Sequence, residues 1–525
     1  MSAQSTTDAI LQLKKTLEQL ALSQQTLSNT NASTSTGHVT SPEPVQYSKE
    51  HLYAYSEKYL DFTYSCPTIY HVVSSMSKFL TEKGFVYISE KDLGVWEKLE
   101  IPGKYYTYRN GTNLCAFTIG KDWKPEYGVG VIGSHIDALH AKLKPASIKS
   151  RVGGFELLGV APYGGTLNEL WVDRDLGIGG RVIVEEGEGK DQKFVSKLID
   201  STPHPIARIP SLAPHFGEAA NMPYDKEDQA VPVIGYFSAD DENEPTDKPT
   251  DDEKKSPLFG KHSIHVLRYV AQLAGVKVSQ LKQLDLELFD VQKGVFAGIK
   301  NDFIIGPRSD DRLCSFSALT SLIEYADATD LSKDSKLNVV CLYDNEEIGS
   351  LSRQGAKGGL MESTVSKIIS SRFVKDSDAT STIKVCFSNS FIISADVIHM
   401  DNPNFTTVYL DNHKPKPNVG LTISLDSNGH MSTDVVGTSV VEEIGRINGD
   451  KLQYFQIKNN SRSGGTIGPS IASQTGARTI DMGIAQWSMH SIRSSTGSKD
   501  VGLAIKFFKG YFESWRSVYD KFGDL

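Results

Sequence analysis

The stretch LNVVCLYDNEEIGS, residues 337–350, decides the fold, because it joins an apolar run to a cluster of acidic side chains. Residues 339–343 have the composition of a buried strand, and this strand leads directly into Asp-Asn-Glu-Glu at 344–347. In α/β proteins, the carboxyl ends of such strands are where ligands bind. Two neighbouring carboxylates repel each other unless a cation or a proton separates their roles. A metal site is one solution, in which one glutamate binds the metal and the other accepts a proton from metal-bound water. A solvated acidic turn is the alternative interpretation, and this stretch alone does not decide between the two.

Length and composition limit the class of protein. The 525 residues exceed one ordinary core, so we expect about two or three domains. The formal net charge of -9 and the absence of a basic run with interleaved aromatic residues argue against nucleic-acid binding. The five cysteines are odd in number and have no short paired spacing, which indicates reduced core thiols. No apolar run of about 18 residues occurs, so neither a membrane span nor a secretory signal is predicted.

The N-terminal region differs from the rest of the chain. Within residues 8–22, Ile10, Leu13, Leu17 and Leu20 follow one another at spacings of 3, 4 and 3, which predicts one apolar face of a helix. Residues 23–46 are rich in Ser, Thr and Asn, and we expect them to form an unfolded linker. The helix could dock on the main body, or it could serve as a recognition or self-association element.

The folded body is predicted to begin near residue 47 and to contain an insertion. Residues 47–141 and 293–525 alternate between strand-like and helix-like segments, whereas residues 142–292 are glycine-rich with short alternating segments. The alternation predicts an α/β fold with a mixed, mostly parallel sheet covered by helices. We interpret residues 142–292 as a β-rich domain inserted into the first.

Several further strand ends carry polar side chains of the same kinds as 344–347. The candidates are His135 with Asp137, Asp310, Glu346 with Glu347, Asp396, and His490. Taken singly, a histidine near an apolar strand is more often a core residue than a ligand. Together, two imidazoles, two aspartates and one glutamate suit zinc, and one carboxylate shared between two ions gives a two-metal site. Asp310 and its neighbour Asp311 compete for the bridging position.

A glycine turn, Gly464-Gly465-Thr466, precedes a predicted helix. It could offer a backbone surface close to substrate, or it could be an ordinary strand-to-helix turn. It is not a phosphate-binding P-loop, because no Gly-Lys-Ser/Thr follows.

The motifs GSHIDAL, PRSDDRLCS, LYDNEEIGSLSRQGA, SADVIH, SGGTIGPS and AQWSMHSIR occur in this order. With them, the chain from about residue 47 to its end resembles the aspartyl aminopeptidase/vacuolar aminopeptidase I family of co-catalytic zinc peptidases. The resemblance implies two zinc ions per subunit, one held by His135, Asp310 and Asp396, and the other by Asp310, Glu347 and His490. Glu346 would then be the general base, and Asp137 would orient His135.

The resemblance also implies an assembly and a substrate preference. The inserted domain resembles the family's dimerisation domain, whose RIPSLAPH motif would lend His215 to a neighbouring subunit's active site within a tetrahedral dodecamer. Acid-selective members carry Lys and Tyr in a segment that we align with TISLDSNGHMSTD, where this chain has Ser424 and Met431. We therefore expect peptide substrates with neutral N-terminal residues such as Leu, bound near these residues and near Gly464 and Gly465.

In relatives that resemble this chain, an N-terminal helical propeptide self-associates, binds a receptor of a selective-autophagy route from cytoplasm to vacuole, and is later removed. The resemblance thus implies that residues 1–22 are a propeptide whose helix 8–22 binds this receptor. It also implies a processing site within 23–46 and a vacuolar destination. Two competing hypotheses are a carrier or scaffold whose working part is the helix, and a carboxypeptidase or deacylase on the same metal scaffold. The intact ligand set argues against a vestigial site.

Overall fold

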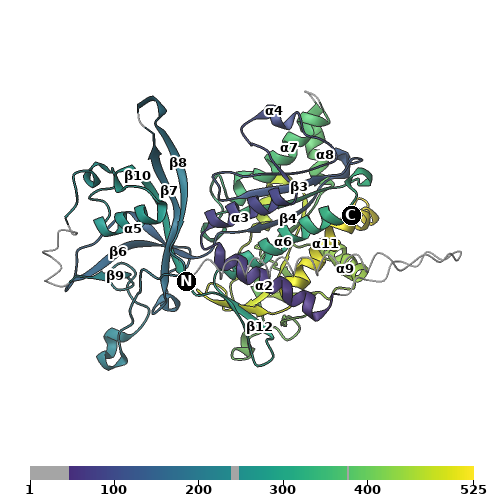
Figure 1. Ribbon diagram of the computed structural model, residues 1–525. Helices are drawn as coiled ribbons and strands as arrows, with labels where there is room; N and C mark the ends of the chain where they lie inside the picture. Colours follow the sequence, from purple (N-terminus) through teal and green to yellow (C-terminus); the bar gives the residue numbers. More distant parts are fainter. Residues whose placement is uncertain (1–46, 188, 238–247, 375–377) are drawn as a thin grey trace. The chain divides into compact units, whose positions relative to one another are not determined.

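The structure is a computed structural model that describes residues 47–525 except 188, 238–247 and 375–377 (Figure 1). The predicted helix at 8–22 and linker at 23–46 lie outside the described residues. The described part belongs to one unit, residues 45–525.

A nine-stranded sheet carries the strand ends singled out above. In spatial order it contains β1 (Val86–Tyr87), β2 (Gly103–Thr107), β3 (Leu114–Ile119), β13 (Leu337–Tyr343), β4 (Gly130–His135), β14 (Phe391–Ala395), β18 (Arg478–Gly483), β16 (Thr422–Leu425) and β17 (Gln453–Gln456). The central strands β13, β4, β14 and β18 are parallel, as are the pairs β1–β2 and β16–β17. The pairs β2–β3, β3–β13 and β16–β18 are antiparallel. The predicted mixed, mostly parallel α/β sheet is confirmed.

Strand β13 shows why the sheet is covered on both faces. All seven of its residues are buried, as expected of a parallel strand with helices on either side. Val340 and Leu342 pack into one core cluster, whereas Val339 and Cys341 pack into the other, because successive side chains of a strand point to opposite faces.

Helices cover the two faces of this sheet (Figure 1). Those in the first cluster are α2 (Lys49–Ser65), α3 (Ile69–Glu82), α6 (Ser309–Ala328), α9 (Val435–Asn448) and α11 (Asp500–Tyr519). Those in the second are α4 (Leu93–Trp96), α7 (Leu360–Arg372), α8 (Ala379–Ser388) and α10 (Gly468–Thr475). Local chemistry sets their ends. For example, the Asp434 side chain accepts the N–H of Gly437 at the start of α9, and Gly449, with φ 69°, ends the helix.

A second sheet is built from the part of the chain that we predicted as an insertion. Its strands, in spatial order, are β8 (Lys193–Asp200), β7 (Leu176–Glu186), β10 (Leu281–Asp290), β5 (His140–Ile148), β6 (Phe155–Tyr163) and β9 (Val233–Tyr236). All neighbouring pairs are antiparallel, and helix α5 (Ile264–Ala274) contributes to the core of this sheet.

A third sheet consists of short strands: β11 (Val295–Ala297), β12 (Phe303–Gly306), β20 (Ser494–Gly497), β19 (Ala485–Trp487) and β15 (Ile398–His399). The turn between β19 and β20 carries His490.

The five cysteines are buried free thiols. In the described part of the chain, none of the helices combines the length and the apolar character that crossing a membrane requires.

Candidate metal centre

Three adjacent parallel strands end at the same edge of the large sheet. β4 lies between β13 and β14, and its last residue, His135, pairs in register with Tyr343 of β13. Chain segment 344–347 therefore leaves the sheet beside His135, and Asp396 does so on the other side, directly after β14. This edge is where parallel sheets place their ligands.

Asp310 and His490 complete the group from other elements. Asp310 lies in the first turn of α6, in a non-helical conformation, and His490 lies in the β19–β20 turn with φ 64°. Asp310 Oδ1 is 3.2 Å from His135 Nε2, and Asp310 Oδ2 is 3.6 Å from His490 Nε2. The two oxygens of one carboxylate thus face two different histidines.

Each histidine has a second carboxylate nearby. Asp396 Oδ1 lies 3.6 Å from His135 Nε2, and Glu347 Oε2 lies 3.5 Å from His490 Nε2. The residues group as His135, Asp311 and Asp396, and as Asp310, Glu347 and His490, with one ligand atom from each member of a group within 4.8 Å of the others. The five predicted ligands therefore meet in one place.

Asp311 is part of the first group, but its oxygens already have protein partners. Its Oδ2 accepts a hydrogen bond from the Ser134 hydroxyl at 2.6 Å, and its Oδ1 accepts the N–H of Cys314 at 3.2 Å. Asp310, by contrast, presents both oxygens to histidines. This difference favours Asp310 over Asp311 as the carboxylate shared by both groups.

The electrostatics of the cluster fit a divalent cation. Burial raises the pKa of Glu347 well above its usual range, and the nearby Asp310 raises it further. Burial opposes the charged form of His135, but hydrogen bonds with Asp137, Asp310 and Asp396 raise its pKa well above the usual value. Glu347 Oε1 is buried without a hydrogen-bond partner among the described residues. Buried carboxylates of this density need a compensating cation, and the mixed imidazole and carboxylate donors suit zinc.

Glu346 and Asp137 lie beside this group. Burial raises the pKa of Glu346 to about 8. Asp137 Oδ1 is 3.3 Å from His135 Nδ1, which leaves Nε2 facing Asp310 and Asp396. Asp137 also accepts the backbone N–H groups of Glu346 and Glu347, each at 3.2 Å. It thus joins the end of β4 to the acidic loop.

The other predicted site residues lie on different elements, and the hydrogen bonds and ion pairs of the described residues do not join them to the candidate ligands. His215 is exposed in the short 3₁₀ segment Pro214–Ala220, and among the described residues no hydrogen bond or ion pair joins it to the ligand group. Gly464 and Gly465 lie in the loop before α10, where an added Cβ would meet nothing within 4 Å. Ser424 is buried in β16, and Met431 is half-buried in the loop that follows it.

Sequence reasoning missed Asp481, a fully buried residue inside β18. Its Oδ1 accepts the hydroxyl of Thr466 at 2.6 Å, and its Oδ2 accepts the N–H of Ser432 at 2.5 Å. It therefore ties the glycine loop to the loop that contains Met431. Burial raises the pKa of Asp481 to about 6. An aspartate between the apolar residues Ile480 and Met482 of a strand is the signal that could have revealed it.

Access to the ligands is uneven. The side chain of His490 is 55% exposed, whereas those of His135, Asp310, Asp396 and Glu347 are at most 15% exposed. The ligand group is thus open on the His490 side.

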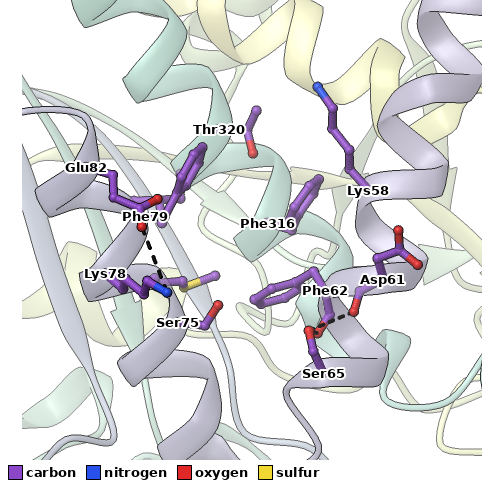
Figure 2. Close-up of a pocket in the computed structure, with 12 residues that line it drawn as sticks. Lys58, Asp61, Phe62, Ser65, Ser75, Lys78, Phe79, Glu82, Phe316 and Thr320 are labelled. Carbon is purple, nitrogen blue, oxygen red and sulfur yellow. Dashed lines mark hydrogen bonds and ion pairs between the residues drawn. The ribbon is translucent and has the colours of Figure 1, made fainter. Parts of the chain in front are cut away.

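A separate hollow of about 410 Å3 lies between α2, α3 and α6 (Figure 2). There the rings of Phe62 and Phe316 lie 5.3 Å apart, and none of the candidate ligands lines the hollow.

Comparison with known proteins gives a consistent picture. The family model described as Aminopeptidase I zinc metalloprotease (M18) matches residues 62–512. Vacuolar aminopeptidase 1 of Saccharomyces cerevisiae is 62% identical over 471 residues, which cover 90% of each chain. A crystal structure titled prApe1 has a TM-score of 0.86 and 60% identity, and covers 90% of this chain and 98% of that one. The S. cerevisiae mApe1 dodecamer has a TM-score of 0.80 and 56% identity, and covers 90% and 99%.

These matches confirm the resemblance predicted from the motifs, and they cover the nine-stranded and the six-stranded sheets alike. The chain is therefore a metalloaminopeptidase and belongs to the Aminopeptidase I zinc metalloprotease (M18) family.

Proposed function

We propose that this protein removes N-terminal residues from peptides through a site that binds two zinc ions. The observation that carries the proposal is the position of Asp310, whose two oxygens lie 3.2 Å and 3.6 Å from the nitrogens of two different histidines. His135, Asp310 and Asp396 would hold one ion, and Asp310, Glu347 and His490 the other. Zinc at this place supplies Lewis-acid polarisation of the scissile carbonyl and a lower pKa for the attacking water.

The chain's own residues would handle the proton and the charge. Glu346 lies outside both ligand groups, so its carboxylate is free to take a proton from the attacking water and pass it to the leaving amine. Asp137 would hold the His135 ring by accepting from Nδ1, which keeps Nε2 directed at the ligand group. His215 of a neighbouring subunit would help to stabilise the negative charge that develops on the carbonyl oxygen.

The proposed substrates are peptides with neutral N-terminal residues such as Leu. Ser424 and Met431 stand where we align Lys and Tyr of acid-selective members, so no cation is supplied there for an acidic side chain. Asp481 supports the assignment of this region, because it fastens the Met431 loop and the Gly464–Gly465 loop to the same buried carboxylate.

Assembly and destination are also proposals. The mApe1 relative is a dodecamer and covers 90% of this chain, which supports a dodecamer here. Within it, residues 142–292 would be the dimerisation domain. The exposure of His215 fits a role at a subunit boundary. The relative named vacuolar aminopeptidase 1 supports delivery to the vacuole, with residues 8–22 as the segment that binds a selective-autophagy receptor and residues 23–46 as the processing region.

Hydrolysis of Leu-p-nitroanilide by the purified protein, measured before and after chelation and after zinc is restored, tests the core of the proposal. We expect activity that the chelator abolishes and that zinc restores, together with two zinc ions per subunit by elemental analysis. A stable protein with bound zinc but no peptidase activity would instead favour a carrier or scaffold. Release of amino acids from the opposite end of a peptide would indicate a carboxypeptidase.

A further inference from the structure

We propose that Tyr163, at the end of β6 in the inserted sheet, is a positioning residue for the metal centre. Its hydroxyl holds Asp137 and, through Asp137, the loop that carries Glu346 and Glu347. This inference rests on the proposed two-zinc function.

The hydrogen bonds of Tyr163 link it to both sides of that loop. Its hydroxyl donates to Asp137 Oδ2 at 2.8 Å and accepts from Asn345 Nδ2 at 2.9 Å. Asp137 Oδ2 also accepts the N–H of Glu347, so the phenol and the loop backbone share one oxygen. Both Tyr163 and Asp137 are buried, with 8% and 2% of their surface exposed.

The Tyr163 ring is itself held in place. It stacks on the imidazole of His140, with ring centroids 4.2 Å apart and an interplanar angle of 13°. The same two residues are register partners in the β5–β6 pair, so the backbone pairing and the ring stacking together hold the Tyr163 ring in one position. His140 Nδ1 lies 2.9 Å from the Ala138 carbonyl oxygen, which anchors this ring to the segment that follows Asp137. The hydroxyl is thus presented from a rigid support.

The turn after Tyr163 presses against the same loop. Gly164 has φ 62°, and a Cβ at this position would lie 2.4 Å from Leu139 Cδ2 and 3.3 Å from the Glu347 carbonyl oxygen. The absence of a side chain at Gly164 therefore permits the turn to approach Glu347 closely. Two contacts therefore connect the six-stranded sheet to the backbone of Glu347, a predicted ligand. One is the hydrogen bond from Tyr163 to Asp137, which accepts the Glu347 N–H, and the other is the close approach of Gly164 to the Glu347 carbonyl oxygen.

A cavity beside Tyr163 limits the size of the expected effect. It has a volume of about 180 Å3, and Asp137, Asn345 and Tyr163 are among the residues that line it. This is room enough for a water molecule to replace a deleted hydroxyl. We therefore expect removal of the hydroxyl to cost about 10-fold in zinc affinity or in turnover, the lower end of what lost partners of metal ligands cost.

The test compares Tyr163→Phe with Tyr236→Phe in the full-length protein. Tyr236 lies in the same sheet but is 60% exposed, so its variant controls for loss of a phenol. For Tyr163→Phe we expect about 10-fold weaker zinc binding in competition with a chromogenic chelator, about 10-fold lower kcat and an unchanged KM. Tyr236→Phe should match the wild type, and neither substitution should alter particle size or Tm.

A double-mutant cycle separates positioning from general stability. Because one of the two hydrogen bonds of the Tyr163 hydroxyl is to Asp137, Tyr163→Phe should have a smaller effect in an Asp137→Asn background than in the wild type, whereas independent effects would add. Additive losses, wild-type zinc affinity in Tyr163→Phe, or a loss that follows a fall in Tm would each overturn the inference. A wild-type protein without zinc or peptidase activity would instead refute the proposed function.

Discussion

Replacing Glu346 by Gln isolates the proposed proton transfer from metal binding. The side chain keeps its size, and the Glu346 N–H that donates to Asp137 at 3.2 Å belongs to the backbone, so the substitution leaves this contact intact. The carboxylate belongs to neither of the two ligand groups. We therefore expect Glu346→Gln to retain two zinc ions per subunit, with the particle size and Tm of the wild type.

The expected loss lies in turnover. An amide cannot accept the proton, and general-base catalysis contributes about 10²–10⁴-fold, which is about 3–5 kcal/mol of barrier. Loss of proton delivery to the leaving amine adds to this. The assay is kcat for Leu-p-nitroanilide with zinc content measured on the same sample, and KM should change little because the ligands that face the substrate are untouched.

The neighbouring residue provides the matched control. Glu347→Gln is the same chemical change one position along, but Glu347 Oε2 lies 3.5 Å from His490 Nε2 and Oε1 has no partner among the described residues. This variant should lose zinc. Near-wild-type turnover in Glu346→Gln would remove Glu346 from the mechanism, and loss of zinc from it would make Glu346 a ligand.

Four further outcomes are expected. If His215 acts across a subunit boundary, hybrid particles of His215→Phe and Glu346→Gln chains should regain activity that neither parent has; verified hybrids without activity would exclude this role. A substrate panel should give a higher kcat/KM for Leu than for Glu or Asp, and the reverse order would refute the alignment of Ser424 and Met431. Leu17→Arg should keep peptidase activity and particle size but prevent particle clustering and vacuolar delivery, scored by maturation in cells; normal maturation would show that the helix is not the targeting signal. Burial raises the pKa of Asp500 from 3.8 to about 7, so its stabilising contribution is present below pH 3.8 and is lost as the pH rises through about 7. Thermal unfolding at pH 5 and pH 8 should show the wild type losing up to about 3 kcal/mol relative to Asp500→Asn, and parallel curves would contradict this.

Much of the fold could be predicted because strands buried on both faces have a strong pattern. Residues 339–343 and 129–132 are apolar runs that end in polar groups, and the structure has both as central parallel strands, β13 and β4. The third sheet left no such signal. Its strands β15 and β19 have two and three residues, too few for any periodicity to show.

The candidate site divides in the same way. His135, Glu347 and Asp396 follow apolar strands directly, so the sequence pattern alone brings them to one edge. His490 lies in a turn with a left-handed backbone. The pattern named it as a candidate ligand near a strand end, and the motif resemblance assigned it to one of the two ions. The role of Tyr163 could not be predicted at all, because its contact with Asp137 depends on how the six-stranded sheet packs against the nine-stranded sheet.

The candidate ligands are distributed along most of the chain: 175 positions separate His135 from Asp310, and His490 lies between the last two strands. No fragment shorter than residues 135–490 contains both candidate ligand groups, and the β4–β13–β14 pairing brings the strand ends that carry three of them to one edge. Closing loops of this length slows folding, and a metal site of this kind exists only where the fold has formed. In the proposed two-zinc function, zinc binding would therefore require a chain that is complete through His490: a nascent or truncated chain that lacks β19, β20 and His490 would have an incomplete site and no peptidase activity. In a cell this timing would keep unfinished chains from cleaving peptides in the compartment where they are made.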